Sequence, residues 1–176
     1  MKDSNNTRPS KGWILAFHPD LICGTALGAN IRDYTFFSYR PEEALHISLR
    51  EKQVILELLD KINQELQRCI DCYSQKIISK YIELLLDYCE RFYERQFITR
   101  NEANKQIIGR FNRLLDHHFH TIQSQSADLP TIEDCAGSLH LSPAYFNDLL
   151  EYETGKSFKE YLQFKRFETA KDWLIN

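Results

Sequence analysis

The sequence contains few glycines and no long apolar run. Its 176 residues include six glycines, and these are not grouped into a phosphate-binding loop. No run of eighteen apolar residues is present, and Met1 to Ser4 lead into a polar stretch instead of the apolar core of a signal peptide. These absences predict a cytoplasmic protein with no membrane contact and no nucleotide-binding loop.

The sequence also lacks a catalytic or metal-binding pattern. His18, Asp20 and Cys23 lie close together, but nothing brings a nucleophile, a base and an oxyanion donor to one place. Adjacent histidines within residues 116–120 would point about 100° apart on a helix, so one metal ion cannot take more than two of them. We therefore predict no enzyme activity, no metal and no cofactor.

Five cysteines, an odd number, are scattered through apolar surroundings. Such a distribution is typical of reduced, buried thiols and not of a disulfide framework. Cys69 and Cys72 form a CxxC motif, but no βαβ pattern surrounds it and no second CxxC completes a zinc site. A helical metal or redox module stays open as a third possibility, and it would require bound zinc or a reactive thiol.

The C-terminal part of the chain has few positive charges. The whole chain has a formal net charge of −3, and residues 129–176 hold five Lys and Arg against eight Asp and Glu. Neutralising phosphates supplies nearly all non-specific DNA affinity, so an acidic module must cluster its few bases to bind. The five Lys and Arg side chains lie around one predicted helix, where they either contact phosphates as a group or form a solvated helix face.

The N-terminal part is predicted to be loop with short strands. Residues 1–11 are polar, whereas residues 12–17 (GWILAF) and 34–39 (YTFFSY) are short β-prone runs. A lone strand is not stable alone, so Trp13, Leu15 and Phe17 must pack against the helices or a second copy of the chain.

From Ser48 the pattern becomes helical. Ser48 and Glu51 have capping-box spacing, and apolar residues then recur every three or four positions to about Arg68. Asp71 to Ser74 offer a break before a second helix of about twenty-five residues. The two helices predict a hairpin within residues 41–98, with more apolar surface than one partner can cover. We predict that it pairs two copies of the chain through Ile55, Leu58, Ile62, Leu66, Ile78 and Leu85.

Residues 99–176 carry the signals of a helix-turn-helix. Thr99 and Glu102 predict another capped helix, and residues 121–128 predict a loop. Beyond the loop, two helix starts lie about eleven residues apart. Thr131 with Asp134 marks the first start, and Ser142 before a proline marks the second.

The turn and the helix ends of this region are also marked. Ala136 is small where two helices must cross, and His140 lies where the turn needs a left-handed residue. Gly155 is placed to end the second helix, and Ser157 with Glu160 begins a third.

Several spaced motifs resemble one family. They are Ala136, LSP at 141–143, Tyr145-Phe146, ETGKSFKEY at 153–161, and the spacing of Arg166, Ala170 and Leu174. Together they resemble the first helix-turn-helix of AraC/XylS-type transcriptional regulators. Upstream, GWILAFHPDLICGT, YTFFSY, EALHIS and ERFYERQFITR are similar to the end of the sensor domain in Bacteroides-like members.

The resemblance implies a division of the chain. Family members hold two helix-turn-helix units after a sensing β-barrel, so this chain would contain the end of the sensor and the first unit only. We expect a mainly α fold, a helical hairpin plus a helix-turn-helix subdomain with a short β remnant near the N-terminus. The expected parts are a barrel remnant at 1–40, a dimerisation hairpin at 41–98 and the helix-turn-helix subdomain at 99–176.

In a helix-turn-helix the early outward positions of the second helix meet base edges in the major groove. Asn147 could pair with adenine, Asp148 could accept from cytosine, and Ala144 could pack on a thymine methyl. Basic side chains near this helix complete the predicted set of DNA-binding residues. The set is Ser142, Ala144, Tyr145, Asn147, Asp148, Glu151, Lys156, Lys165 and Arg166. Their alternative role is a solvated acidic face.

We therefore predict a dimeric, AraC-type regulator that binds double-stranded DNA, with a small-molecule effector in the full-length protein. The alternative is a dimerisation or protein-interaction fragment without DNA affinity of its own. In that case the acidic helix-turn-helix contacts another protein or caps the helical core.

Overall fold

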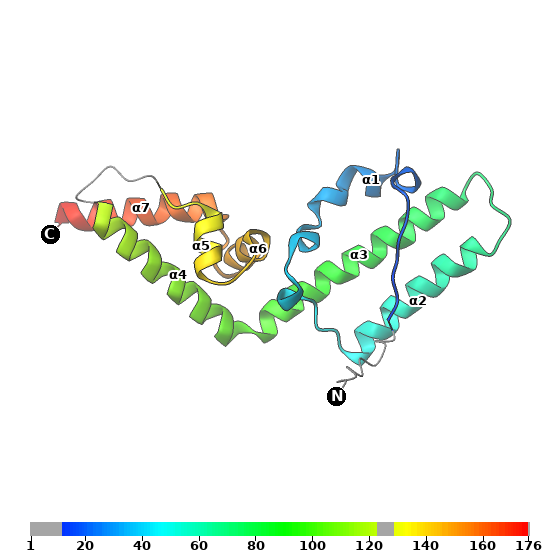
Figure 1. Cartoon of the computed structure of the whole chain (residues 1–176), viewed down its shortest axis with the longest axis horizontal. Coiled ribbons are helices and arrows are strands. Elements are labelled where there is room, and N and C mark those ends of the chain that lie inside the picture. Colours follow the sequence, from blue (N-terminus) through cyan, green and yellow to red (C-terminus); the bar gives the residue numbers. More distant parts are fainter. Residues whose placement is uncertain (1–11, 123–128, 176) are drawn as a thin grey trace, which may run out of the picture.

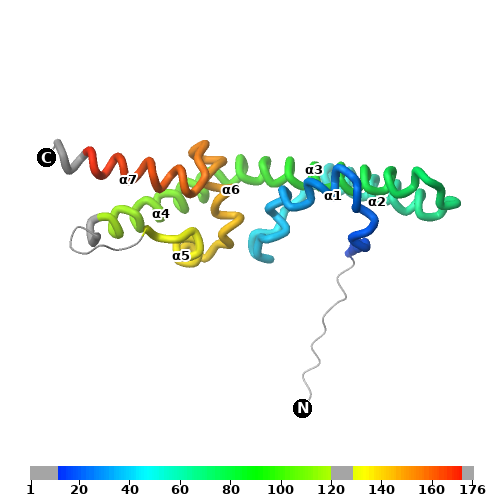
Figure 2. Tube along the Cα trace, turned by 90° about the horizontal axis from the view of Figure 1, so that it is seen from above, coloured from blue at the N-terminus to red at the C-terminus, as the bar shows by residue number. Residues whose placement is uncertain are grey.

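The structure is a computed structural model that describes residues 12–122 and 129–175. It is an elongated helical molecule (Figures 1 and 2). The hairpin of α2 (Leu49–Leu66) and α3 (Ser74–Thr99) lies at one end, and the helices from α4 (Asn101–Ile122) to α7 (Phe158–Ile175) lie at the other. The mainly α prediction is confirmed. The predicted loop at residues 1–11 and most of the one at 121–128 lie outside the described part of the chain.

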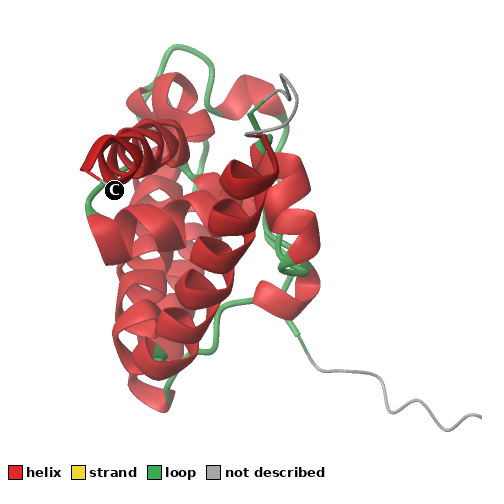
Figure 3. Cartoon of the chain, turned by 90° about the vertical axis from the view of Figure 1, so that its left-hand side faces the viewer, coloured by secondary structure: helices red, strands yellow, loops and turns green. Residues whose placement is uncertain are grey.

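The predicted β remnant is wrong for the part of the chain that the structure describes, where Figure 3 shows no strand. Residues 12–18 have no regular structure, and the YTFFSY stretch contains a short 3-10 helix instead. The N-terminal part consists of short elements, which are η1 (Pro19–Leu21), α1 (Ala26–Asn30), η2 (Ile31–Asp33), η3 (Thr35–Ser38) and η4 (Pro41–Glu43).

These short elements pack on the hairpin. Leu27 and Tyr34 are buried in the same cluster as the hairpin residues, and Leu15 and Phe36 pack against it. Trp13, which also belongs to the apolar face of the predicted strand, keeps 76% of its surface exposed. The expected packing against the helices therefore holds for Leu15 but not for Trp13.

The hairpin forms as its sequence pattern predicts. Helix α2 (Leu49–Leu66) begins at the capping box of Ser48 and Glu51, and α3 (Ser74–Thr99) follows the break at 71–74. Arg95 Nε donates to Glu51 Oε1 at 2.6 Å, and Arg95 Nη2 donates to the carbonyl of His46 at 2.7 Å. The end of α3 is thereby fastened to the start of α2.

Most residues predicted to pair two chains are used inside one chain. Leu58, Ile62, Ile78 and Leu85 are buried in the core between α2, α3 and the N-terminal elements, and Ile55 packs against that core. Only Leu66, at 55% exposure, keeps much of its surface free. The short N-terminal elements cover the hairpin face that a second hairpin was expected to cover.

Helix α4 (Asn101–Ile122) follows α3 after a single residue. The predicted capping box of Thr99 and Glu102 is wrong, because Thr99 is the last residue of α3 and its hydroxyl donates to the carbonyl of Gln96 at 3.1 Å. Asn104 Nδ2 donates to the carbonyl of Phe97 at 2.9 Å, so a buried side chain links the two helices where the chain bends.

The helix-turn-helix forms where it was predicted. Helices α5 (Ile132–Ser138), α6 (Pro143–Thr154) and α7 (Phe158–Ile175) pack with α4 around one core. Thr131 and Ser142 cap α5 and α6 as predicted, since their hydroxyls accept from the N–H groups of Asp134 and Tyr145, both at 3.2 Å. The third predicted start is also present, because the Ser157 N–H donates to Glu160 Oε2 at 2.9 Å.

Two residues with positive φ set the geometry of this subdomain. His140, in the turn between α5 and α6, has φ 61°, and Gly155, which ends α6, has φ 67°. The Gly155 N–H donates to the carbonyl of Glu151 at 2.7 Å. A left-handed residue at each position therefore reverses the chain direction as the sequence predicts.

Candidate nucleic-acid interface

The inner face of α6 anchors it in the core. Phe146, Leu149 and Leu150 are fully buried, as predicted, and Phe146 meets Phe111 of α4 edge to face with ring centroids 4.9 Å apart. Ala136 of α5 is also fully buried, so α5 can lie close to α6. The core fixes which face of α6 points away from the subdomain.

The outward first turn of α6 is covered by another part of the same chain. We call residues 34–43, which contain η3 and η4, the linker segment; it lies between α3 and α6 in Figure 1. Ser142 is only 3% exposed and Tyr145 only 4%. In this arrangement neither side chain is open to a DNA base.

Glu43 makes the most buried contact between the linker segment and α6. Its Oε1 accepts from the Ser142 N–H at 2.6 Å, and its Oε2 accepts from the Ser142 hydroxyl at 2.5 Å. Oε2 also accepts from the Arg40 N–H at 2.7 Å. Glu43 is 4% exposed, and a buried carboxylate is stable only with such donors around it.

Asp148 is held by the linker segment too. Its Oδ2 accepts hydrogen bonds from the hydroxyls of Thr35 and Tyr39, the latter at 2.6 Å. Burial raises the pKa of the Tyr39 hydroxyl, and the hydrogen bond to Asp148 raises it further, so Tyr39 stays a donor at neutral pH. Tyr39 also packs edge to face on Tyr145, with centroids 5.1 Å apart. The carboxylate expected to meet cytosine is thus occupied inside the chain.

The other predicted contacts on α6 differ in accessibility. Ala144 is half-buried and Glu151 is exposed. Asn147 Oδ1 accepts from the Phe158 N–H at 3.1 Å, which connects α6 to the start of α7. Its amide oxygen is therefore engaged, and its NH2 group is the part left to contact a ligand.

The predicted basic residues lie around α7. Lys156 lies over the ring of Phe164 at 5.2 Å, and Lys165 Nζ forms an ion pair with Glu168 at 3.1 Å. Arg166 is exposed. Two of the three predicted phosphate contacts therefore already have partners on α7, and Arg166 is the most accessible of the three.

The contact between the linker segment and α6 was not predicted from the sequence. Thr35 and Tyr39 belong to a stretch expected to be a strand, and Glu43 is separated from Ser142 by 99 residues. A sequence signal for it was the acidic character of α6, because a helix with Asp148 and Glu151 in outward positions is better suited to hydroxyl and amide donors than to phosphates.

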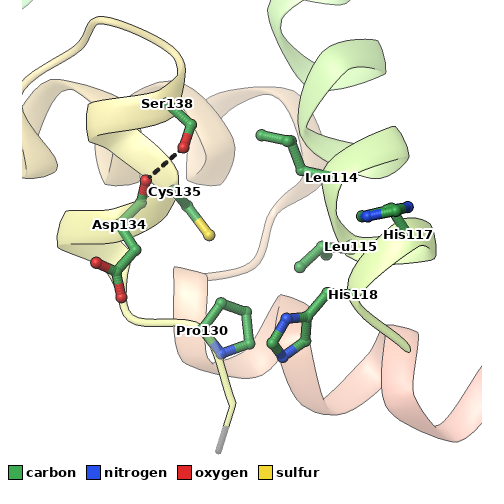
Figure 4. Close-up of a pocket in the computed structure, with 8 residues that line it drawn as sticks. All are labelled: Leu114, Leu115, His117, His118, Pro130, Asp134, Cys135 and Ser138. Carbon is green, nitrogen blue, oxygen red and sulfur yellow. Dashed lines mark hydrogen bonds between the residues drawn. The ribbon is translucent and has the colours of Figure 1, made fainter. Parts of the chain in front are cut away.

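A small pocket lies between α4 and α5 (Figure 4). It measures about 350 Å³, and Leu114, Leu115, Pro130 and Cys135 supply its apolar part. Burial raises the pKa of Cys135 to about 11, so the thiol is protonated at neutral pH and a poor nucleophile. Among the described residues, no group of three or more His, Cys, Asp or Glu is placed to hold a metal ion.

Comparison with known proteins gives one informative match. Over 87 residues, which are 48% of this chain, the sequence is 28% identical to a Bacillus subtilis (strain 168) protein named uncharacterized HTH-type transcriptional regulator YtdP. The matched segment spans only 11% of that protein's length. No family model matches the chain, and no solved structure matches it. Within the described residues, no helix has the length and apolar character needed to span a bilayer.

Proposed function

We propose that the chain is a DNA-binding transcriptional regulator of the AraC type in which α6 is the recognition helix. The observation that carries this proposal is the geometry of α5 and α6, two capped helices joined by a turn with a left-handed His140. The similarity to a helix-turn-helix regulator supports the same class of function.

In this proposal α6 leaves the linker segment before it enters a major groove. Ser142, Tyr145 and Asp148 all face the linker segment, and a groove cannot accept the first turn of α6 while Glu43 and Tyr39 cover it. The contact between the linker segment and α6 therefore competes with DNA for the same helix face.

The test is a selection of duplexes from a random library by the full chain, followed by salt titration of the selected duplex. Phosphate contacts reduce log K linearly with log salt, by about 0.9 per contact. Arg166→Ala is expected to weaken all duplexes alike and to lower that slope by about one. Lys52→Ala, an exposed residue on α2, is the matched control and should leave binding unchanged.

We also propose that two copies pair, because two linked recognition helices bind adjoining half-sites far better than one. Leu66 is the predicted interface residue that is still exposed. Leu66→Glu should convert a dimeric native mass into a monomeric one. The control is Leu49→Glu at the other end of α2, where an exposed leucine was not predicted to pair.

The second candidate function is an interaction fragment without DNA affinity. The observation in its favour is that α6 already has an intramolecular partner, with Glu43 buried against its first residue. In that case the selection would enrich no duplex at any salt concentration.

A further inference from the structure

A cleft of about 370 Å³ lies between the N-terminal elements, α3 and α6. Its walls combine aromatic rings and carboxylates with the hydroxyl of Thr35, and the described residues that line it include no lysine or arginine. Carboxylates on helix surfaces are common and do not define a site by themselves. The ring lining is a separate feature, and it makes the cleft different from a solvated acidic face.

The rings form a connected wall. Phe36 stacks on Tyr93 with centroids 5.5 Å apart and an interplanar angle of 24°, and Tyr39 meets Tyr93 edge to face at 5.1 Å. Phe97 and Tyr152 form a second pair at 5.4 Å. The face of such a ring attracts a cation, most strongly where water is excluded.

The carboxylates carry negative charge that no described lysine or arginine of the cleft wall balances. They are Asp33, Glu90, Glu94, Asp148 and Glu151. Ion pairs occur elsewhere in the described chain, but none involves one of these five groups.

Their mutual repulsion is visible at one of them. Burial raises the pKa of Glu90, and the nearby charges of Asp87, Glu94, Asp148 and Asp33 raise it further. Arg91 lines a neighbouring depression together with Glu90 and Glu94, yet it forms no ion pair with either. The cleft therefore has a negative potential that a bound cation would relieve.

The kind of cation follows from the lining. Among the described residues, no three carboxylates, histidines or cysteines are close enough together to coordinate a metal ion. An ammonium group needs no such coordination sphere, and the carbon atoms next to it can pack on rings. The volume suits a small organic molecule or a single side chain.

We propose that this cleft binds an organic ammonium ion, with its charge among the carboxylates and its carbon atoms against the rings of Tyr93 and Tyr152. The ligand is either a free amine or the lysine side chain of a peptide. Because α3, η3 and α6 all line the cleft, the ligand holds α6 against the linker segment. The further consequence that the ligand opposes DNA binding rests on the proposed function.

The test is calorimetric titration of the full chain, without DNA, with putrescine, choline or Nα-acetyl-lysine amide. NaCl and MgCl2 at matched ionic strength are the reference titrations. We expect saturable binding of one organic ammonium ion per chain and a higher unfolding temperature in its presence. Tighter binding of putrescine or choline identifies a free small-molecule ammonium ion, and tighter binding of the lysine derivative identifies a peptide side chain.

Variants distinguish specific binding in the cleft from non-specific attraction of cations to an acidic surface. Glu90→Gln and Tyr93→Leu are each expected to weaken binding about tenfold. Tyr152→Leu is included because Tyr152 is 42% exposed, so we expect this variant to fold. Glu102→Gln, on α4 and outside the cleft, is the matched control.

Two results would overturn the proposal. One is heat no larger than that of NaCl or MgCl2 at equal ionic strength. The other is full binding by a folded Tyr152→Leu or Tyr93→Leu variant, since it would remove the role of the rings. Because no DNA is present, a chain that fails to select a duplex leaves this measurement unaffected, and the two proposals can fail separately.

Discussion

The carboxylate of Glu43 is bonded to both the backbone N–H and the hydroxyl of Ser142, at 2.6 and 2.5 Å. Ser142 is also the N-cap of α6, and its hydroxyl accepts from the Tyr145 N–H at 3.2 Å. One buried carboxylate therefore supports the cap of the helix and attaches that helix to the linker segment. A negative charge at a helix N-terminus is favourable as well.

Replacing Glu43 with alanine should weaken both the cap of α6 and the attachment of α6 to the linker segment. The variant leaves the Ser142 N–H without its acceptor, and an unsatisfied buried donor costs about 1 to 3 kcal/mol of unfolding free energy. Chemical denaturation measures that loss. The same variant should also bind the selected duplex more tightly than the wild type does, because the linker segment covers α6 less firmly.

Glu42→Ala is the matched control for Glu43. Glu42 is the neighbouring residue of η4 and is exposed, so its removal should change the unfolding free energy by about 0.5 kcal/mol or less. Equal losses for both variants would contradict the role assigned to the bonds between Glu43 and Ser142.

Gly155 and Gly137 should respond to alanine in opposite directions. Gly155 has φ 67° and open space around its Cα, so Gly155→Ala carries a backbone penalty of about 1 to 2 kcal/mol with no clash. Gly137 lies within α5, also with open space, so Gly137→Ala should stabilise by about 0.5 to 1 kcal/mol. Thermal unfolding of both variants gives the comparison. A stabilised Gly155→Ala variant would contradict the left-handed conformation of Gly155 at the end of α6.

The contribution of Glu51 should depend on pH. Burial acts to raise the pKa of Glu51, but hydrogen bonds from Ser48 and Arg95 outweigh it and hold the pKa below its usual value. A lowered folded-state pKa means that the stabilisation is present above the unfolded-state pKa and is lost as pH falls through the folded one.

The measurement is the difference in unfolding free energy between the wild type and Glu51→Gln from pH 7 down to pH 3. We expect the difference to favour the wild type at pH 7 and to shrink steadily as the pH falls. A difference that stays constant over this range would mean that the charge of Glu51 does not contribute.

The cysteines should divide into two groups by reactivity. Cys23, Cys69 and Cys72 are exposed, whereas burial raises the pKa values of Cys89 and Cys135 to about 11. At pH 8 an alkylating reagent should modify three thiols quickly and the other two only after unfolding. Mass spectrometry of the time course counts them, and five fast thiols would contradict the packing around α3 and α5.

The sequence predicted the local structure of the helices well. Ser48, Thr131, Ser142 and Gly155 mark helix ends by hydrogen bonds that span three or four residues, and such signals are complete within the local sequence. Thr99 failed as a start signal because α3 continues through it, and its hydroxyl bonds back to Gln96.

The long-range contacts could not be predicted. The β-prone stretch at 34–39 has the composition of a strand, but in the described chain it has no partner strand and packs on α3 and α6 instead. The same packing uses Leu58, Ile62 and Ile78, which had been assigned to a dimer interface. A hydrophobic pattern tells which residues are buried but not which surface buries them.

The most direct test of the proposed function is retention of duplex DNA by the full chain as salt is raised, measured for the wild type and for Glu43→Ala. We predict retention at low salt that falls steeply and linearly in log salt, with stronger retention by Glu43→Ala. No retention by either protein at low salt would contradict DNA binding and leave the helix-turn-helix as an intramolecular or protein-binding module.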